Sequence, residues 1–338
     1  MPAKTVVVSV LPVPGSPFGE ELTLAADQRP STLGSADPGS SSPPEIVRAV
    51  RDMYARHPFP PPQRKYSYRR HATYVRRFLA DRGIDPRGRE FGDIACGTGL
   101  MMLDYAREFP EASITGYDIS PASVELVNET LGQEGVTNAR ASVRDITALD
   151  LAEQFDYIVS WGTVHHLPNP AEGIAILCRA LKPGGILRVG VYGYYGNWER
   201  RVQQEIIRSI TETAGGDDAA RIEAVRVWAR GDRNFKNYYT APPVDLDDDN
   251  WVVDEFLHVW ERHLELRDVV SWLGAQGMRV LRMTDYYDQE IPLEVGCHSS
   301  SPAFTAMVEK LPFESQCHVI EMIVRPYWLS LFAEKTGG

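Results

Sequence analysis

A short segment of small residues, Asp93-Ile94-Ala95-Cys96-Gly97-Thr98-Gly99, follows an apolar run and has the composition of a ligand-binding turn. Small residues there allow the backbone to approach a bound nucleotide closely. A dinucleotide-binding turn has a third glycine three residues after Gly99, but Met102 occupies that position. The segment therefore favours a nucleoside without a diphosphate and argues against NAD or FAD.

Two carboxylates follow the next two apolar runs. Asp118 comes nineteen residues after Gly99, where a carboxylate can accept hydrogen bonds from both hydroxyl groups of a ribose. Asp145 precedes Ile146, a pair suited to an adenine, because the carboxylate accepts from the exocyclic amine while the apolar side chain packs on the ring. Each carboxylate alone would be an ordinary cap or turn residue. Together, at successive strand ends, they predict a nucleoside site.

The elements that position these residues are predicted from apolar runs that alternate with helical patterns, which is typical of βαβ units and a parallel sheet. Ser120-Pro121 is typical of a helix start, and Lys182-Pro183-Gly184-Gly185 predicts a turn before the fifth strand. The five predicted strands are residues 91–95, 113–117, 139–143, 156–160 and 186–191.

The alternation stops after the fifth strand for about seventy residues, which are helical, aromatic and acidic in pattern. It resumes with a helix over 265–275, a strand over 278–284 and a final strand over 318–324. We therefore expect an α/β fold with a doubly wound, mostly parallel seven-stranded sheet of Rossmann-like type. A helical cap is inserted after its fifth strand.

The N-terminal residues have a different composition. Residues 1–44 are rich in Pro, Ser, Gly and Ala and predict a disordered tail, and the apolar run 6–11 is too short for a signal peptide or a membrane span. Two helices then follow on either side of a proline cluster. The expected divisions are the tail, N-terminal helices covering the cofactor site, the cofactor-binding core, a cap on the acceptor side and the rest of the sheet: 1–44, 45–88, 89–193, 194–264 and 265–338.

Taken together, these motifs resemble the class I S-adenosylmethionine-dependent methyltransferases. The resemblance covers about residues 74–192 and, more weakly, 265 to the end, and Val164-His165-His166-Leu167-Pro168-Asn169-Pro170 is similar to the small-molecule branch. It implies S-adenosyl-L-methionine as the cofactor and methyl transfer to a small-molecule substrate. The matching segments are 93–99, 118–119, 145–146, 155–160 and 181–185.

The resemblance also implies roles for single residues at the cofactor site. Asp93 orients the glycine loop and the methionine amine of the cofactor, and Ala95, Gly97 and Gly99 line the cofactor. The Ala95 position is usually glycine, so its methyl group slightly crowds the methionine end.

The remaining cofactor contacts come from the later strands and the first helix. Asp118-Ile119 holds the ribose and Asp145-Ile146 the adenine, as their positions already suggested. We expect Trp161, at the end of the fourth strand, to pack against the cofactor, with ordinary core packing as the alternative. Tyr54, close to Pro58-Phe59-Pro60, is expected to bring the first helix over the methionine end.

His165 and His166 are the candidate catalytic residues, because they lie just beyond the fourth strand, where the resemblance places the reactive methyl group. Histidine titrates near neutral pH, so we expect one of them, with His166 ahead of His165, to act as a base or to orient the acceptor. The alternative is that a histidine only bonds the loop backbone. The histidine pair favours oxygen over nitrogen or carbon as the methylated atom.

The cap contributes candidates for the acceptor side. His258 and His263 either face the acceptor or satisfy helix ends, and the acidic run 245–249 lacks the glycine and glutamate of a calcium-binding loop. No metal site is expected. The aromatic residues of the cap region suit a lid over an organic acceptor, although most are expected to be packing residues: Tyr192, Tyr194, Tyr195, Trp198, Tyr238, Tyr239, Trp251 and Trp260.

The bulk composition limits the partners. The 35 basic and 46 acidic residues give a net charge of -11, which opposes binding to phosphate backbones, so neither nucleic acid nor membrane is an expected partner. Four scattered cysteines show no metal or redox spacing, as expected of a reduced cytoplasmic protein. Three alternatives to methyl transfer remain: a cyclisation or other rearrangement at the same site, a non-enzymatic binding module, and, disfavoured by Met102, a nicotinamide oxidoreductase.

Overall fold

The computed structural model describes residues 42–61, 67–214, 217–235 and 244–337. The predicted disordered tail lies outside these ranges apart from residues 42–44, and the cap residues Tyr238 and Tyr239 lie outside them as well. Among the helices of the described ranges, none is both long and apolar enough to cross a bilayer.

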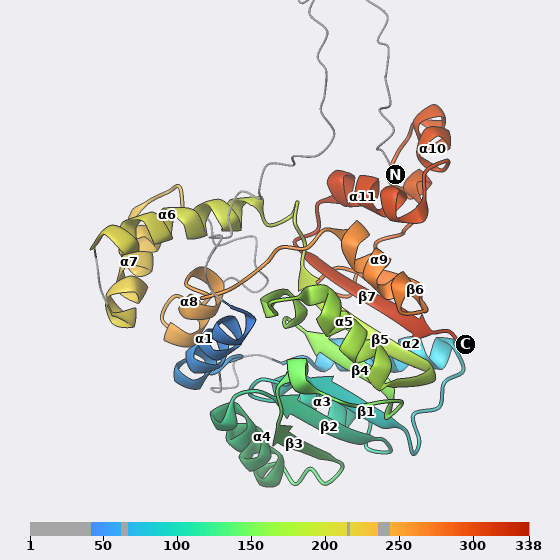
Figure 1. The fold of residues 1–338 in the computed structure, drawn as a ribbon, viewed down its shortest axis with the longest axis horizontal. Coiled ribbons are helices and arrows are strands. Elements are labelled where there is room, and N and C mark those ends of the chain that lie inside the picture. Colours follow the sequence, from blue (N-terminus) through green and yellow to red (C-terminus); the bar gives the residue numbers. More distant parts are fainter. Residues whose placement is uncertain (1–41, 62–66, 215–216, 236–243, 338) are drawn as a thin grey trace, which may run out of the picture. The chain divides into compact units, whose positions relative to one another are not determined.

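Seven strands form one sheet in the order β3-β2-β1-β4-β5-β7-β6, in which β7 alone runs antiparallel to its neighbours (Figure 1). This confirms the predicted fold class. The order reverses between β1 and β4, and open α/β sheets bind ligands at such a reversal, outside the carboxyl ends of the strands. The strands are β1 Glu90–Ile94, β2 Ser113–Asp118, β3 Ala139–Val143, β4 Phe155–Trp161, β5 Leu181–Tyr192, β6 Met278–Thr284 and β7 Trp328–Lys335.

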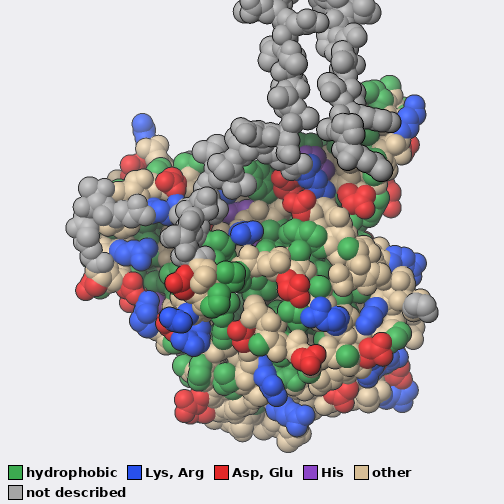
Figure 2. All heavy atoms as spheres, viewed as in Figure 1, with side chains coloured by type: hydrophobic (Ala, Val, Ile, Leu, Met, Phe, Trp, Pro, Cys, Tyr) green, Lys and Arg blue, Asp and Glu red, His purple; other side chains and the backbone are tan. Residues whose placement is uncertain are grey.

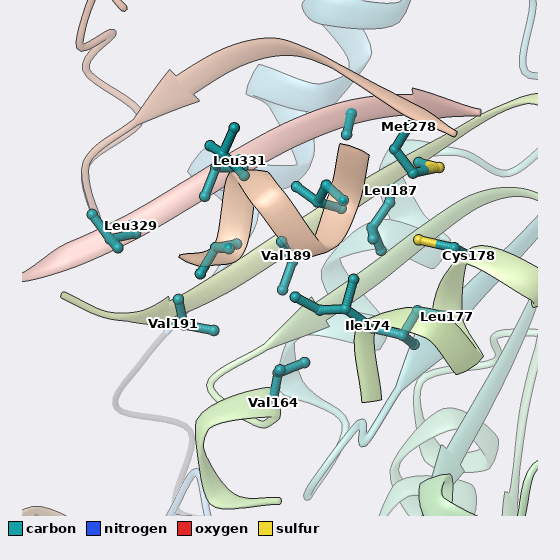
Figure 3. Close-up of a cluster of buried hydrophobic side chains, with 14 of the residues drawn as sticks. Val164, Ile174, Leu177, Cys178, Leu187, Val189, Val191, Met278, Leu329 and Leu331 are labelled. Atoms are coloured by element: carbon teal, nitrogen blue, oxygen red, sulfur yellow. The ribbon is translucent and has the colours of Figure 1, made fainter. Parts of the chain in front are cut away.

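Helices cover both faces of the sheet, and each face has its own apolar core. On one face, Phe78 and Met102 pack with sheet residues such as Tyr157. The other face is shown in Figure 3, where Ile174 and Leu177 lie against side chains of β5 and β7. The helices concerned are α2 Arg69–Asp81, α3 Leu100–Glu108 and α4 Pro121–Gln133 on the first face, and α5 Pro170–Ala180, α9 Leu266–Ala275 and α11 Phe313–Val324 on the second.

Short helices and caps complete these layers. Ser120 caps α4 by accepting a hydrogen bond from the Ser123 NH at 3.3 Å, and Pro121 occupies the first turn, as predicted. Asn169 and Pro170 begin α5 in the same way. The remaining short elements are the 3-10 turns η1 Ile146–Ala148, η2 Val164–His166 and η3 Val295–Cys297 and the helix α10 Pro302–Val308.

The segment after β5 is helical, as predicted, and packs together with the first helix of the chain. Met53 of α1 lies in one apolar cluster with Ile207, Val225 and Val252, which come from three different cap helices. Figure 1 shows α1 beside α8. The first helix and the cap therefore share one core, built from α1 Pro43–Arg56, α6 Trp198–Ala214, α7 Asp218–Gly231 and α8 Asp249–Phe256.

The predicted last strand over 318–324 is wrong, because these residues form the end of helix α11. Their apolar run fits either element by length, and the helix buries Cys317, Ile320 and Glu321 at the spacing of a helical face. The last strand is β7, ten residues later, and it is buried between β5 and β6.

The predicted turn at Lys182-Pro183-Gly184-Gly185 also differs, because these residues belong to the first part of β5. The pairing of β4 with β5 shifts register between Phe155 and Tyr157, opposite this part of the strand. Gly184 has a φ of 74°, which only glycine adopts without strain. The predicted turn is therefore wrong, because the left-handed glycine is accommodated inside the strand.

Candidate active site

A cavity of about 440 Å³ lies at the carboxyl ends of the strands. Nine of the ten residues predicted to bind the cofactor line it, and Gly99 is the exception. His166 lines the cavity and His165 does not. The nine are Tyr54, Asp93, Ala95, Gly97, Asp118, Ile119, Asp145, Ile146 and Trp161.

The glycine loop is shaped by close approaches that leave no room for side chains. Gly97 has a φ of 53°, and a Cβ added there would lie 2.3 Å from the carbonyl oxygen of Phe59. Gly99 has a φ of 78°, and its added Cβ would meet Val127 of α4 at 2.7 Å. Gly99 thus allows α3 and α4 to pack closely. Ala95 lies in the left-handed region at a φ of 65°, the strained conformation that explains why glycine is usual there.

Asp118, at the end of β2, accepts a hydrogen bond from the glycine loop that follows β1. Its Oδ2 accepts from the Gly97 NH at 2.8 Å and its Oδ1 from the Ser120 NH at 2.9 Å. Burial raises the pKa of Asp118, although these backbone hydrogen bonds oppose the shift. An ionised carboxylate has about four lone-pair sites, so it can accept two further hydrogen bonds from a ligand facing the cavity.

Asp145 lies at the end of β3, as predicted, and begins the turn η1. Its Oδ1 accepts from the NH and the hydroxyl of Thr147, both at 2.8 Å, which fixes the orientation of the carboxyl group. Ile146 is buried and lines the same part of the cavity. The pair is thus placed side by side, as the adenine interpretation requires.

Asp93, on β1, is buried with its Oδ2 lacking a hydrogen-bond partner among the described residues. Burial, together with the nearby negative charge of Asp118, raises its pKa to about 7. A buried carboxylate without a partner carries a large desolvation cost. A cationic group of a ligand in the cavity would remove that cost.

His166 has a defined tautomer. Its Nδ1 lies 3.1 Å from the carbonyl oxygen of Trp260, which can only accept, so Nδ1 carries the proton and Nε2 keeps a lone pair. The ring stacks on His258 at 3.9 Å between centroids. Burial lowers the pKa of His166 to about 3, the Trp260 carbonyl opposing and Arg200 reinforcing the shift. His166 is therefore neutral at pH 7.

Tyr54 is held beside the stacked rings of His166 and His258 by hydrogen bonds to His258 and Asp254. The Trp260 NH donates to Nδ1 of His258 at 3.0 Å, so Nε2 of His258 carries the proton and donates to the Tyr54 hydroxyl at 3.2 Å. The hydroxyl donates in turn to Oδ1 of Asp254 at 2.9 Å. This chain of hydrogen bonds joins α1 to α8 and to His258 just after it, and places Tyr54 in the cavity wall.

His165 is fully buried behind His166, and its two ring nitrogens have no hydrogen-bond partner among the described residues. Potential ligand atoms of His165, His166 and Glu261 lie within 4.8 Å of one another, counted over the described ranges. Arg200 donates to Oε2 of Glu261 at 2.9 Å, and Gln204 donates to Oε1 at 3.1 Å. A guanidinium cation thus already compensates this carboxylate, and we assign no metal ion here.

Several wall residues escaped prediction. His71, Tyr68 and Arg70 come from α2 and the residue before it, while Tyr286 follows β6 and Trp328 begins β7. No sequence motif marks these residues, because the residues they meet in the cavity wall are distant in the sequence. Of the cap aromatics, Tyr192 and Trp251 line the cavity, whereas Trp198 is half exposed.

Comparison with known proteins finds similarity to methyltransferases. Residues 92–185 match a family of methyltransferase domains. An uncharacterized protein of Synechococcus sp. is 28% identical over 259 residues, which are 73% of this chain and 62% of that protein. A malonyl-[acyl-carrier protein] O-methyltransferase of Anoxybacillus flavithermus is 32% identical over 101 residues, 30% of this chain and 38% of the relative.

Among solved structures, PKMT2 from Rickettsia typhi in complex with AdoHcy has a similar fold, with a TM-score of 0.61 and 18% identity. The match covers 82% of this chain and 54% of that one. The chain thus spans less than two thirds of the length of these three proteins.

Proposed function

Residues 92–185 form a class I S-adenosylmethionine-dependent methyltransferase domain, and from that premise we propose that this protein methylates an oxygen atom of a small organic acceptor. When bound, S-adenosylmethionine supplies an electrophilic methyl group on a positively charged sulfur atom. The observation that carries the proposal is that Asp93, Asp118, Asp145 and His166 line one and the same cavity.

The residues of the cavity fit this cofactor. Asp93 offers a buried carboxylate oxygen without a partner to the amine, and Asp118 has free lone pairs for the ribose hydroxyls. Asp145 and Ile146 follow β3, the next strand after β2 in the sheet, and line the same cavity, so they can receive the base.

The acceptor end of the cavity lies over β4, β5 and β7, because the strands that hold the nucleoside are β1, β2 and β3. Trp161, Tyr192 and Trp328 line that end and exclude water from it. His166 contacts the acceptor there through Nε2, either as a base or as a hydrogen-bond acceptor that orients a hydroxyl group. His165 has no access to the cavity and supports the ring of His166 at 4.1 Å between centroids.

The test is transfer of label from methyl-labelled S-adenosylmethionine to a panel of small molecules that carry phenol, alcohol, carboxylate or amine groups. We expect labelled methyl ethers or esters, and label on amines alone would contradict oxygen as the acceptor atom. Product formation without movement of label would instead identify a cyclisation or rearrangement.

A His166→Ala variant tests whether the imidazole of His166 takes part in methyl transfer. We expect turnover to fall by about 10²-fold, the lower range for a general base, while affinity for S-adenosylhomocysteine stays nearly unchanged. Calorimetry and initial rates give the two quantities. An equal loss of both would assign His166 a structural role.

A further inference from the structure

His71 on α2 forms a second histidine site in the cavity wall. Its side chain is 3% exposed, and Nδ1 lies 2.9 Å and 3.1 Å from the two carboxylate oxygens of Asp288, which follows β6. Asp288 also forms an ion pair with Arg188, a fully buried residue of β5. Burial alone would raise the pKa of Asp288, but the hydrogen bond from His71 and the charge of Arg188 outweigh burial and lower it.

The tautomer of His71 follows from these contacts. Nδ1 of His71 lies 3.4 Å from the Arg188 guanidinium, which only donates, but closer to both oxygens of Asp288, at 2.9 Å and 3.1 Å. An ionised carboxylate only accepts hydrogen bonds, so we assign the proton to Nδ1, which donates to Asp288. The opposite nitrogen, Nε2, then keeps its lone pair, and among the described residues it forms no hydrogen bond. Because Nδ1 faces Asp288 and the residue lines the cavity, Nε2 is the nitrogen that His71 presents to a ligand.

His71 lies at the acceptor end of the cavity. Its ring is 4.8 Å from the ring of Trp161, at the tip of β4, and 5.6 Å from that of Tyr286, which follows β6. Asp118 ends β2 and Asp145 follows β3, on the other side of β1 in the sheet. A nucleoside held by those carboxylates would therefore leave His71 next to the remaining space.

The two cavity histidines differ in how they would carry a positive charge. Nδ1 of His166 is bonded to a neutral carbonyl group, whereas Nδ1 of His71 is bonded to a carboxylate. An imidazolium formed at His71 would therefore be stabilised by a charge-assisted hydrogen bond, the arrangement that orients and supports a histidine base. Burial lowers the pKa of His71 to about 4, with Asp288 opposing and Arg188 reinforcing the shift, so the ring is neutral and able to accept a proton at pH 7.

We propose that Nε2 of His71 accepts the proton of the acceptor hydroxyl during methyl transfer, with Asp288 as the positioning residue. The inference rests on the proposed function. The oxygen forms its new bond to the methyl carbon while the carbon–sulfur electron pair stays with sulfur, and the hydroxyl proton moves to Nε2 and then to solvent. The sulfonium becomes a neutral thioether, and the released proton accounts for its positive charge.

The groups around His71 support this assignment. Arg188 stacks between Trp161 and Phe332, at 4.5 Å and 4.9 Å from the ring centroids, and so fixes the carboxylate that it pairs with. On the same helix, Arg70 lies 3.6 Å from Oδ2 of Asp288. The other titratable groups near the imidazole are the phenols of Tyr68 and Tyr286, whose rings lie at 5.7 Å and 5.6 Å.

The first experiment needs no acceptor. Nitrogen-15 NMR of histidine-labelled full-length protein with S-adenosylhomocysteine reports which ring nitrogen is protonated, and the His71→Ala variant assigns the signals. We expect His71 at pH 7 to be protonated on Nδ1 alone, and Asp288→Asn to change that tautomer balance. A proton on Nε2 in the wild type would overturn the proposal, because no lone pair would then face the cavity.

The second experiment measures methyl transfer from labelled S-adenosylmethionine to phenols of different acidity. His71→Ala keeps the Asp288–Arg188 ion pair, and we expect it to lower kcat by about 10²-fold or more for weakly acidic phenols. The loss should shrink for a nitrophenol that is already ionised at the assay pH. Added imidazole should restore part of the rate. The matched control is His298→Ala, a partly exposed histidine outside the cavity wall.

The outcomes separate this inference from the proposed function. Wild-type protein that moves label to no hydroxyl acceptor contradicts the proposed function, whatever the tautomer of His71. Transfer by His71→Ala at the wild-type rate, or a loss that is independent of phenol acidity and not rescued by imidazole, overturns His71 as the base. A larger, acidity-dependent loss in His166→Ala than in His71→Ala would also overturn it.

Discussion

At the scale of single residues, Asp118 gives the sharpest test of the cofactor site. Its carboxylate is buried and bonded to the Gly97 NH, so Asp118→Ala removes both the ligand contacts and a support of the loop. We expect affinity for S-adenosylhomocysteine to fall by about 2 to 3 kcal/mol, the range for hydrogen bonds to a charged group. Calorimetry measures the loss, and the exposed Asp85→Ala serves as the control. Unchanged affinity would contradict the ribose assignment.

Asp93 predicts a pH dependence. Its pKa of about 7 in the folded protein lies above the ordinary 3.8, so between about pH 4 and 7 the folded state binds more protons than the unfolded state and this group's contribution to stability falls as pH rises. An amine bound beside Asp93 favours the ionised form. We therefore expect S-adenosylhomocysteine to bind more tightly as pH rises towards 7 and to release protons on binding at pH 6.

Calorimetry in buffers of different ionisation enthalpy measures that proton release. Asp93→Asn should lose most of it. Asp254→Asn is the matched control, because burial raises the pKa of Asp254 to about 7 as well but its Oδ1 is bonded to Tyr54. If Asp254→Asn removes the proton release and Asp93→Asn keeps it, the amine does not bind at Asp93.

Most of the candidate cofactor residues line one cavity, and the sequence could single them out because they stand at or near strand ends, within a few residues of their neighbours in the motif. Tyr54, on α1, is the exception. His71 could not be predicted, because its partner Asp288 lies 217 residues away and no spacing links them. One signal was present: Arg188 is a charged residue within the apolar run 186–191, and a buried charge requires a partner. That signal indicates a buried ion pair without telling where its counterion lies.

At the scale of elements, the alternating pattern located the first four strands to within one or two residues. The prediction of a strand over 318–324 was wrong because an apolar run of seven residues fits a strand or a helix equally well. The difference is a tertiary contact: Glu321 of α11 is fully buried and accepts from the Leu266 NH at 2.6 Å and the Tyr194 NH at 3.2 Å. The charged side chain of Glu321 within this apolar run indicated that one face of the run contacts polar groups.

Glu321 therefore carries a prediction about stability. Its carboxylate caps the start of α9 and ties the segment after β5 to α11. Glu321→Ala would leave the Leu266 NH without this acceptor, while the Tyr194 NH keeps its bond to the Leu264 carbonyl at 2.9 Å. We expect the free energy of unfolding to fall by about 1 to 3 kcal/mol, the range for one buried group left unsatisfied. Urea unfolding measures it, with Glu314→Ala, exposed on the same helix, as the control. Equal effects of the two variants would show that these contacts do not stabilise the fold.

At the scale of the whole described region, the nucleoside end of the cavity belongs to the sheet, while part of its wall belongs to a separate core of α1 and the cap helices. Acidic and basic side chains are interspersed on the surface over the face shown in Figure 2, so the concentration of carboxylates in the cavity wall is a local feature of the site. Sequence patterns identified each helix separately. They could not show that α1 joins the cap, because that packing depends on contacts between segments about 150 to 200 residues apart.

Because α1 contributes Val47, Val50 and Tyr54 to the cavity wall, ligand binding should stabilise that helix more than the sheet. A ligand that binds only the folded state stabilises it by about 2.7 kcal/mol at a hundred times its Kd, and local opening of a contacted element is suppressed with it. We expect hydrogen exchange of α1 to slow markedly with saturating S-adenosylhomocysteine. Exchange of α10, which contributes no residue to the wall, should stay nearly unchanged. Equal slowing of both helices would mean that the ligand acts through global stability and that α1 does not close over it.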